Sequence, residues 1–157
     1  MAPRQTNTRS LTDVRKIYGA VVDLVGIMNS PQRDARMIRE AGIALDRALF
    51  PLLVLVDRFG PIGVVNLADR VGRDYTTVSR QLAKLESLGL VGREASQRDK
   101  RIRETVITRK GREMTSAIDK ARDRILTAML REWSHQEITT LARLLRQLAD
   151  AALGLES

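Results

Sequence analysis

The sequence contains no cysteine, and this absence removes several classes of function at once. Without thiols there is no disulfide framework, no cysteine-based zinc finger and no thiol redox switch. Histidine occurs once, at His135, so metal sites of the common kinds are also excluded. We find no glycine-rich phosphate loop and no nucleophile motif. The sequence therefore predicts neither an enzyme nor a bound cofactor.

Aromatic residues and long apolar runs are also scarce. Aromatics make up only 3% of the 157 residues, so the core of this one-domain chain must be aliphatic. No apolar run approaches the roughly 18 residues of a membrane span. The N-terminus lacks the apolar core of a signal peptide. We expect a cytoplasmic protein that does not contact a membrane.

Basic residues are abundant, and they are concentrated in one part of the chain. The formal net charge is +8, which points to an anionic partner. Between Arg70 and Arg112 there are twelve basic residues and five acidic ones, so this segment carries nearly all of the excess. The high share of arginine suits contacts to guanine and phosphate, although codon bias in a GC-rich genome explains most of it.

The segment from Asp74 to Gly89 is typical of an amphipathic helix. Asp74 is a plausible N-cap, and Gly89 is a plausible stop. At helical spacing one stripe is apolar and the opposite side is polar. The apolar stripe consists of Val78, Leu82 and Leu85, and the polar side of Thr76, Thr77, Arg80 and Lys84. Taken alone, such a helix is more often an ordinary surface helix with a solvated basic face.

The neighbouring segments favour a different interpretation. Val64, Leu67, Ala68 and Val71 have the spacing of a short buried helix, and Gly72 permits a sharp turn after it. Two helices joined by a short turn containing glycine form a helix-turn-helix, whose second helix enters the major groove of DNA. Residues 90–95 and 102–108 then predict a hairpin with a basic tip, which is either a solvated loop or a contact to a polyanion.

The rest of the chain is predicted to be helical, at residues 11–29, 31–41, 46–59, 109–131 and 135–153. Ser30 is expected to cap the second of these helices. Pro51 is expected to kink the third, with Phe59 turned inward. Ser134 and Glu137 have the spacing of a capping box for the last helix. The first and last helices are more apolar than a small core requires, which predicts either a partner surface or packing against each other.

The chain resembles the MarR family of bacterial transcriptional regulators along nearly its whole length. The motifs that carry the resemblance are Leu67-Ala68, residues 77–80, residues 85–91, residues 98–101 and residues 107–111. Their order and spacing both match the family pattern. The chain departs from the family pattern at two positions. Ser96 stands where the wing often has an acid, and Gly63 stands where the first helix of the helix-turn-helix often has a Ser or Thr cap.

The resemblance implies a mainly α fold with a small β-wing. This winged helix-turn-helix would have about six helices and form an intertwined homodimer. Residues 1–42 and 109–157 would supply the dimerisation helices, and residues 43–108 the DNA-binding lobe. The function implied is a sequence-specific transcriptional regulator, a repressor released by a ligand, that binds a palindromic operator.

The expected DNA contacts fall into two groups. Major-groove contacts are expected from Thr76, Thr77, Arg80 and Lys84, with Gln81 at the margin, and Arg80 is the expected reader of bases. Thr77 and Ser79 could equally clamp phosphates or cap the helix locally. By resemblance, Arg101 reaches the minor groove and Asp99 braces it. The expected phosphate contacts are Arg73, Arg98, Lys100 and Arg103.

Family resemblance also implies a small aromatic ligand, bound near Tyr18 and Met37. Apolar residues at a helix junction belong to a core more often than to a pocket. Two other functions remain open from the sequence. One is a non-specific architectural DNA binder, and the other is a winged helix used for protein or RNA contact.

Overall fold

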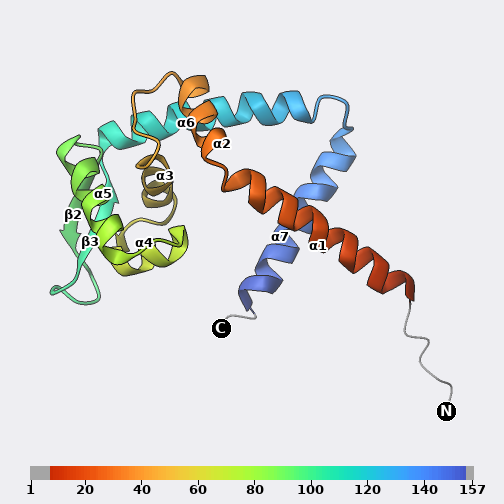
Figure 1. Cartoon of the computed structure of the whole chain (residues 1–157), viewed down its shortest axis with the longest axis horizontal. Helices are drawn as coiled ribbons and strands as arrows, with labels where there is room; N and C mark the ends of the chain where they lie inside the picture. Colours follow the sequence, from red (N-terminus) through yellow and green to blue (C-terminus); the bar gives the residue numbers. More distant parts are fainter. Residues whose placement is uncertain (1–7, 155–157) are drawn as a thin grey trace, which may run out of the picture. The chain divides into compact units, whose positions relative to one another are not determined.

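The computed structural model describes residues 8–154, which form seven helices and three strands (Figure 1). The chain divides into two compact units, one ending at Ile118 and the other beginning at Asp119. The elements are α1 (Thr8–Met28), α2 (Pro31–Ala41), α3 (Phe50–Phe59), β1 (Ile62–Gly63), α4 (Val64–Val71), α5 (Tyr75–Ser87), β2 (Val91–Ala95), β3 (Arg103–Ile107), α6 (Arg109–Met129) and α7 (His135–Gly154). The predicted mainly α fold with a small β-wing is therefore confirmed, with seven helices where about six were expected.

The core of the first unit lies between α3, α4, α5 and the sheet. As the scarcity of aromatics requires, this core is aliphatic. Its fully buried members come from all three helices: Leu52, Leu53, Val56, Leu67, Val78, Leu82 and Leu85. The apolar stripes predicted for α4 and α5 are the faces that enter this core. The opposite faces of both helices are thereby left at the surface.

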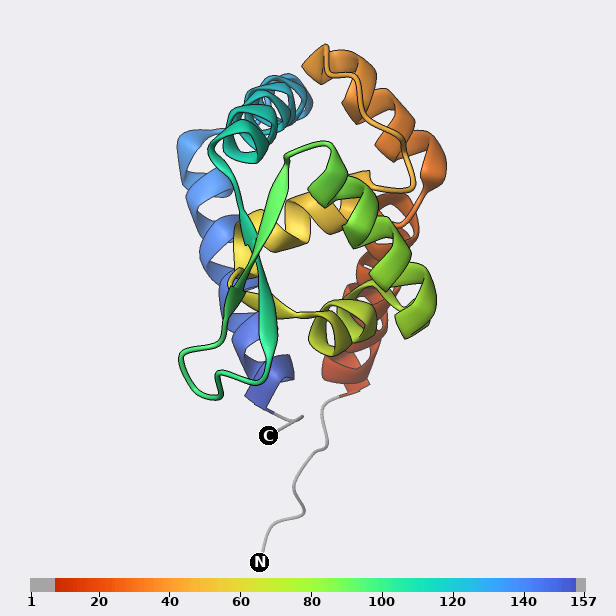
Figure 2. The same cartoon turned by 90° about the vertical axis from the view of Figure 1, so that its left-hand side faces the viewer.

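The sheet has three antiparallel strands in the order β1-β3-β2. The hairpin strands pair from Val91 opposite Ile107 to Ala95 opposite Arg103. Figure 2 shows α3 behind the hairpin, and α3 and β3 are in contact. The two-residue strand β1 pairs with Thr105 and Glu104 and was not predicted. Two residues are too few to show the alternation that identifies a strand.

The third helix begins later than the sequence predicted. A helix over 46–59 with a kink at Pro51 was expected, but α3 starts at Phe50 and Pro51 lies in its first turn. Proline is compatible with this place, because the first amides of a helix have no partner in any case. Asp46 instead forms a local turn, in which its Oδ1 accepts from the Ala48 amide at 2.7 Å.

Two side chains differ from their predicted roles. Phe59 was expected to face inward, but it is 37% exposed, and the guanidinium of Arg70 lies 4.0 Å from its ring centre. This contact gives the ring a partner outside the core. Ser30 precedes α2 as predicted, yet its hydroxyl donates to Gln32 Oε1 and does not cap the helix.

The second unit contains the predicted capping box. The Ser134 amide and hydroxyl both donate to Glu137 Oε2, at 2.8 and 2.7 Å, and the Glu137 amide donates back to Ser134 Oγ at 3.2 Å. The bond from the Ser134 hydroxyl lowers the pKa of Glu137 most, and the bond from the Ser134 amide lowers it further. This box fixes the start of α7, although none of the residues described in α7 is buried.

Both α1 and α7 expose apolar side chains. On α1 the exposed fractions run from 37% at Val21 to 71% at Tyr18. The exposed large apolar residues of α7 are Leu141, Leu144, Leu145, Leu148 and Leu153. Within residues 8–154 no helix is long and apolar enough to cross a membrane. A continuous apolar surface of this kind on a helix is typical of a partner interface.

Candidate nucleic-acid interface

The N-terminus of α5 is fixed by Asp74. Its Oδ1 accepts from the Thr77 amide at 2.8 Å, and its Oδ2 accepts from the Thr77 hydroxyl at 2.6 Å. Both bonds lower the pKa of Asp74, and the bond from the Thr77 hydroxyl has the larger effect. Thr77 therefore takes part in the local cap of the helix, and its expected contact with DNA stays a prediction. The predicted N-cap is confirmed.

The C-terminus of α5 is fixed by residues that lie far along the chain. Gly89 adopts the left-handed conformation with φ of 71°, as its role as a stop predicts. Lys110 Nζ donates to the Leu88 carbonyl at 2.8 Å, and Thr108 Oγ1 donates to the Gly89 carbonyl at 2.6 Å. The last carbonyl groups of a helix lack intrahelical partners, and Lys110 donates to the one at the C-cap, Leu88. Thr108 donates to the carbonyl of the next residue. The end of α5 is thereby tied to the start of α6.

Gly111 makes this connection sterically possible. A Cβ at this position would lie 2.1 Å from the Leu90 carbonyl oxygen and 2.6 Å from Ile107 Cδ1. Only glycine allows the first turn of α6 to approach the backbone after α5 so closely. The segment 107–111 was singled out in the sequence without a physical role. The structure shows that it attaches α5 to the sheet and to α6.

The exposed face of α5 presents the predicted polar residues. Thr76, Arg80 and Lys84 are exposed, whereas Ser79 is half-buried. Gln81 is also half-buried, and its Oε1 accepts from Arg73 Nη1 at 3.0 Å. The helix therefore offers a hydroxyl, a guanidinium and an ammonium group to a partner, on a support that is held at both ends.

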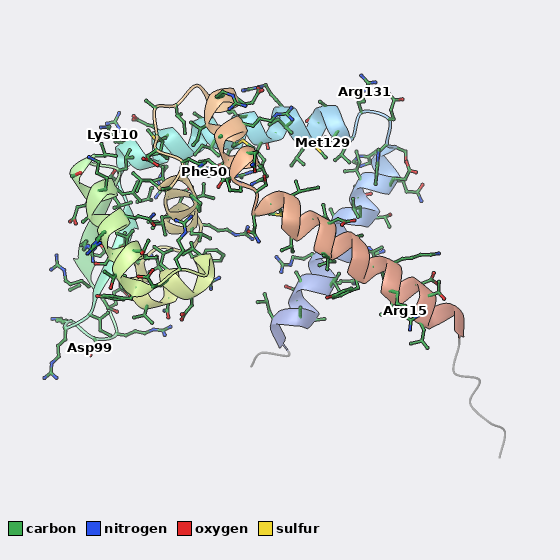
Figure 3. All side chains as sticks on the ribbon, viewed as in Figure 1. Arg15, Phe50, Asp99, Lys110, Met129 and Arg131 are labelled. Carbon is green, nitrogen blue, oxygen red and sulfur yellow. The ribbon has the colours of Figure 1, made fainter. Side chains whose placement is uncertain are left out.

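Local hydrogen bonds order the tip of the hairpin, where Figure 3 labels Asp99. Asp99 Oδ1 accepts from the Arg101 amide at 2.9 Å, so it braces this residue through the backbone. Ser96 is buried, its amide donates to the Ile102 carbonyl at 2.8 Å, and its hydroxyl accepts from the Arg98 amide at 3.3 Å. The serine therefore helps to order the wing where the family pattern has an acid.

The basic residues of the hairpin lie in two different settings. Arg98, Lys100 and Arg101 are exposed around the tip. Arg103 is exposed at the start of β3, next to the tip loop, and its Nη2 donates to the Arg93 carbonyl at 3.2 Å. Figure 3 places Asp99 at the free end of the hairpin and Lys110 at the opposite end. The tip thus projects cations away from the core, whereas Arg103 is engaged across the strands.

The two residues expected near a ligand differ in exposure. Met37 is buried, and Tyr18 is 71% exposed on α1. An open hollow of about 520 Å³ lies elsewhere, in the second unit, and its lining includes Leu126, Leu130 and Ile138. Among the described residues no group of three histidine, cysteine or acidic side chains could hold a metal ion.

Three residues of the site had no assigned role in the sequence. Lys110 and Thr108 hold the end of α5, and Ser96 orders the wing. The motif 107–111 marked the first two as special, but the bonds they make join residues about twenty positions apart in the chain. For Ser96 the only signal was its departure from the family pattern.

This arrangement defines a winged helix-turn-helix DNA-binding protein: a supported helix with a polar outer face, beside a hairpin with a basic tip.

The family model described as HVO_A0114 matches residues 44–105. YxaD of Bacillus subtilis (strain 168), an uncharacterised HTH-type transcriptional regulator, is 36% identical over 107 residues, which cover 68% of this chain and 75% of YxaD. YdgJ of the same organism, also an uncharacterised HTH-type transcriptional regulator, is 29% identical over 118 residues, covering 75% of this chain and 72% of YdgJ.

Solved structures share the fold over almost the entire chain. A MarR family protein from Bacillus stearothermophilus has a TM-score of 0.70 at 20% identity, covering 94% of this chain and 99% of that one. The crystal structure of MarR has a TM-score of 0.60 at 22% identity, covering 99% and 97%. The chain belongs to the MarR family of transcriptional regulators.

Proposed function

We propose that the chain is a homodimeric repressor that binds a palindromic operator sequence-specifically. The observation that carries the proposal is the pairing of a firmly held α5 with a cationic wing tip. The exposed Arg80 lies on the first, and the exposed Arg101 lies on the second. A helix suits the major groove, and an arginine on a projecting loop suits the narrower minor groove.

The proposed contacts divide by chemistry. Arg80 reads a guanine, because a guanidinium matches the two acceptors on the guanine edge. Thr76 and Lys84 lie on the same exposed face and contact neighbouring bases or phosphates. Arg98 and Lys100 at the wing tip contact phosphates, which fix the register of the protein but carry no sequence information. Since the partner is chromosomal DNA, the protein acts at the nucleoid.

The homodimer is supported by the apolar surfaces of α1 and α7. An isolated chain would leave Leu11, Val14 and Ile17 more than half exposed to water. A second copy of the chain would cover these residues. Burial of apolar surface stabilises an interface by about 25 cal/mol per Å² before the costs of association are subtracted. A two-fold dimer presents two copies of α5, which accounts for a palindromic operator.

Selection from a random duplex library, followed by footprinting, tests the proposal. We expect the selected duplex to be palindromic, with two protected half-sites roughly 34–36 Å apart, which is one turn of DNA. Placing the selected duplex over a reporter promoter should lower transcription when the protein is present. A library that yields no enriched sequence would favour the architectural function. An enriched single half-site would argue against the dimer.

A further inference from the structure

Arg73 lies in the turn between α4 and α5, and its guanidinium bonds to the protein on two sides. Its Nη1 donates to the Ala48 carbonyl at 3.0 Å and to Gln81 Oε1 at 3.0 Å. This nitrogen carries two hydrogens, and the two bonds use both of them. Ala48 lies ahead of α3, and Gln81 lies in the second turn of α5. One side chain therefore links the recognition helix to the segment before α3.

The backbone of Arg73 is also bonded within the protein. Its amide donates to the Ala68 carbonyl at 3.1 Å, beyond Gly72, whose φ of 63° ends α4. Its charge also acts on Asp34 of α2. Burial raises the pKa of Asp34, and Arg73 acts in the opposite direction together with neighbouring arginines. The guanidinium thus starts from a fixed backbone and is engaged by groups from other elements.

This geometry changes what Gln81 can do. A guanidinium only donates hydrogen bonds, so the amide oxygen of Gln81, and not its nitrogen, must face Arg73. A glutamine that reads adenine uses its oxygen and its nitrogen together. With the oxygen bonded to Arg73 and the side chain half-buried, Gln81 is not arranged for that reading.

We propose that Arg73 is a positioning residue that sets the rotation of α5 about its own axis, with Gln81 as its partner within the protein. This inference rests on the proposed DNA-binding function and adds a determinant of specificity to it. Arg80, the proposed base reader, is the next residue to Gln81. A recognition group must be held within roughly 0.5 Å and 10–20° of its working geometry, so a small rotation of α5 misplaces Arg80.

Salt titration separates positioning from phosphate contact. The affinities of the wild type and of Arg73→Ala are measured on the selected duplex and on a scrambled duplex over a range of salt concentrations. We expect Arg73→Ala to lower the ratio of the two affinities roughly tenfold and to leave the salt slope unchanged. Lys100→Ala is the matched control, and it should lower the slope by about one and leave the ratio unchanged.

A double-mutant cycle tests whether Arg73 acts through Gln81. Gln81→Leu removes the acceptor, keeps a side chain of similar size and leaves every charge in place. We expect its ratio of affinities to fall as in Arg73→Ala, and the double variant to fall no further, because the two residues form one unit. Thermal unfolding of each variant checks that the fold is intact. If Arg73→Ala unfolds, Gln81→Leu alone still tests the loss of discrimination.

Three results would overturn the inference. A salt slope lowered by about one in Arg73→Ala, with the ratio unchanged, would make Arg73 a phosphate contact. Losses that add in the double variant would show that the two residues act independently. Equal binding of both duplexes by the wild type would remove the proposed function itself. The wild-type ratio therefore distinguishes failure of the function from failure of the inference.

Discussion

Arg80 and Lys100 are both exposed cations, but they lie on different parts of the surface, one on α5 and one at the wing tip. Arg80→Ala should cost about 1–3 kcal/mol on the operator and relax base preference at one position. Lys100→Ala should weaken binding to all sequences alike, because a phosphate is present in every sequence. Competition binding with single-base operator variants measures both effects. If each substitution reduced the affinity for the operator and the affinity for random DNA by the same factor, the assignment of roles would be wrong.

Gly111 is the residue at which the fold tolerates a side chain least. Gly111→Ala places a methyl group 2.1 Å from the Leu90 carbonyl oxygen, so the junction between α5 and α6 must open. We expect a loss of about 1–3 kcal/mol in the free energy of unfolding, measured by urea denaturation. Gly92→Ala is the control, because its nearest neighbour would be Val106 Cγ2 at an ordinary 3.7 Å. Equal stability of the two variants would contradict the close contact.

At the scale of the element, the Asp74 cap makes the first turn of α5 depend on pH. Hydrogen bonds from Thr77 lower the pKa of Asp74, so the stabilisation is present above the pKa of the unfolded chain. It is lost as pH falls through the lowered pKa of the folded state. Thr77→Val removes the hydroxyl and should raise the pKa of Asp74, which carboxyl NMR titration measures directly. An unchanged pKa would show that the hydroxyl bond is not formed.

An asparagine at the same position provides the control. Asp74→Asn keeps a good N-cap but cannot ionise in this range. Its unfolding free energy should lack the part of the acid dependence that Asp74 contributes in the wild type. An identical dependence on pH in the two proteins would assign the effect to other carboxyl groups.

The sequence predicted the helices well where their own spacing decides the structure. The stripe of Val78, Leu82 and Leu85 identified the buried face of α5, since the same side of a helix recurs at this spacing. The start of α3 was wrong because Asp46 forms a local turn that competes with the helix.

Contacts between distant segments could not be predicted from the sequence. Arg73 and Ala48 are 25 positions apart, and the contact of Phe59 with Arg70 joins α3 to α4. Neither contact leaves a periodic signal in the chain. From the sequence, Arg73 was therefore interpreted as a phosphate contact. Phe59 was interpreted as a core residue because it follows the apolar spacing of the third helix.

At the scale of the whole molecule, the exposed apolar face of α1 leads to a prediction about assembly. Val14→Asp combined with Val21→Asp places two charges on this face and should convert the proposed dimer to a monomer, because unpaired charges are costly to bury. Analytical ultracentrifugation measures the change. The control is Val65→Asp, which alters an equally apolar residue that is 60% exposed on α4. A wild-type monomer, or a dimer in all three proteins, would contradict this interface.

The distribution of basic residues and the geometry of α5 and the wing together bear on the kind of DNA binding. The excess of basic residues lies in the segment that contains α5 and the wing, so the partner is expected to be a polyanion. Charge alone would serve an architectural protein equally well. A sequence-specific regulator differs from an architectural protein in that α5 must be held firmly enough for Arg80 to select a base.

The most direct test is therefore the affinity for a selected operator against a scrambled duplex of the same length, measured at two salt concentrations. The account predicts that the operator binds at least about 10³-fold more tightly near physiological salt. Both affinities should fall as salt rises, since phosphate contacts release counterions in each complex. Equal affinities with the same steep dependence on salt would contradict a sequence-specific regulator.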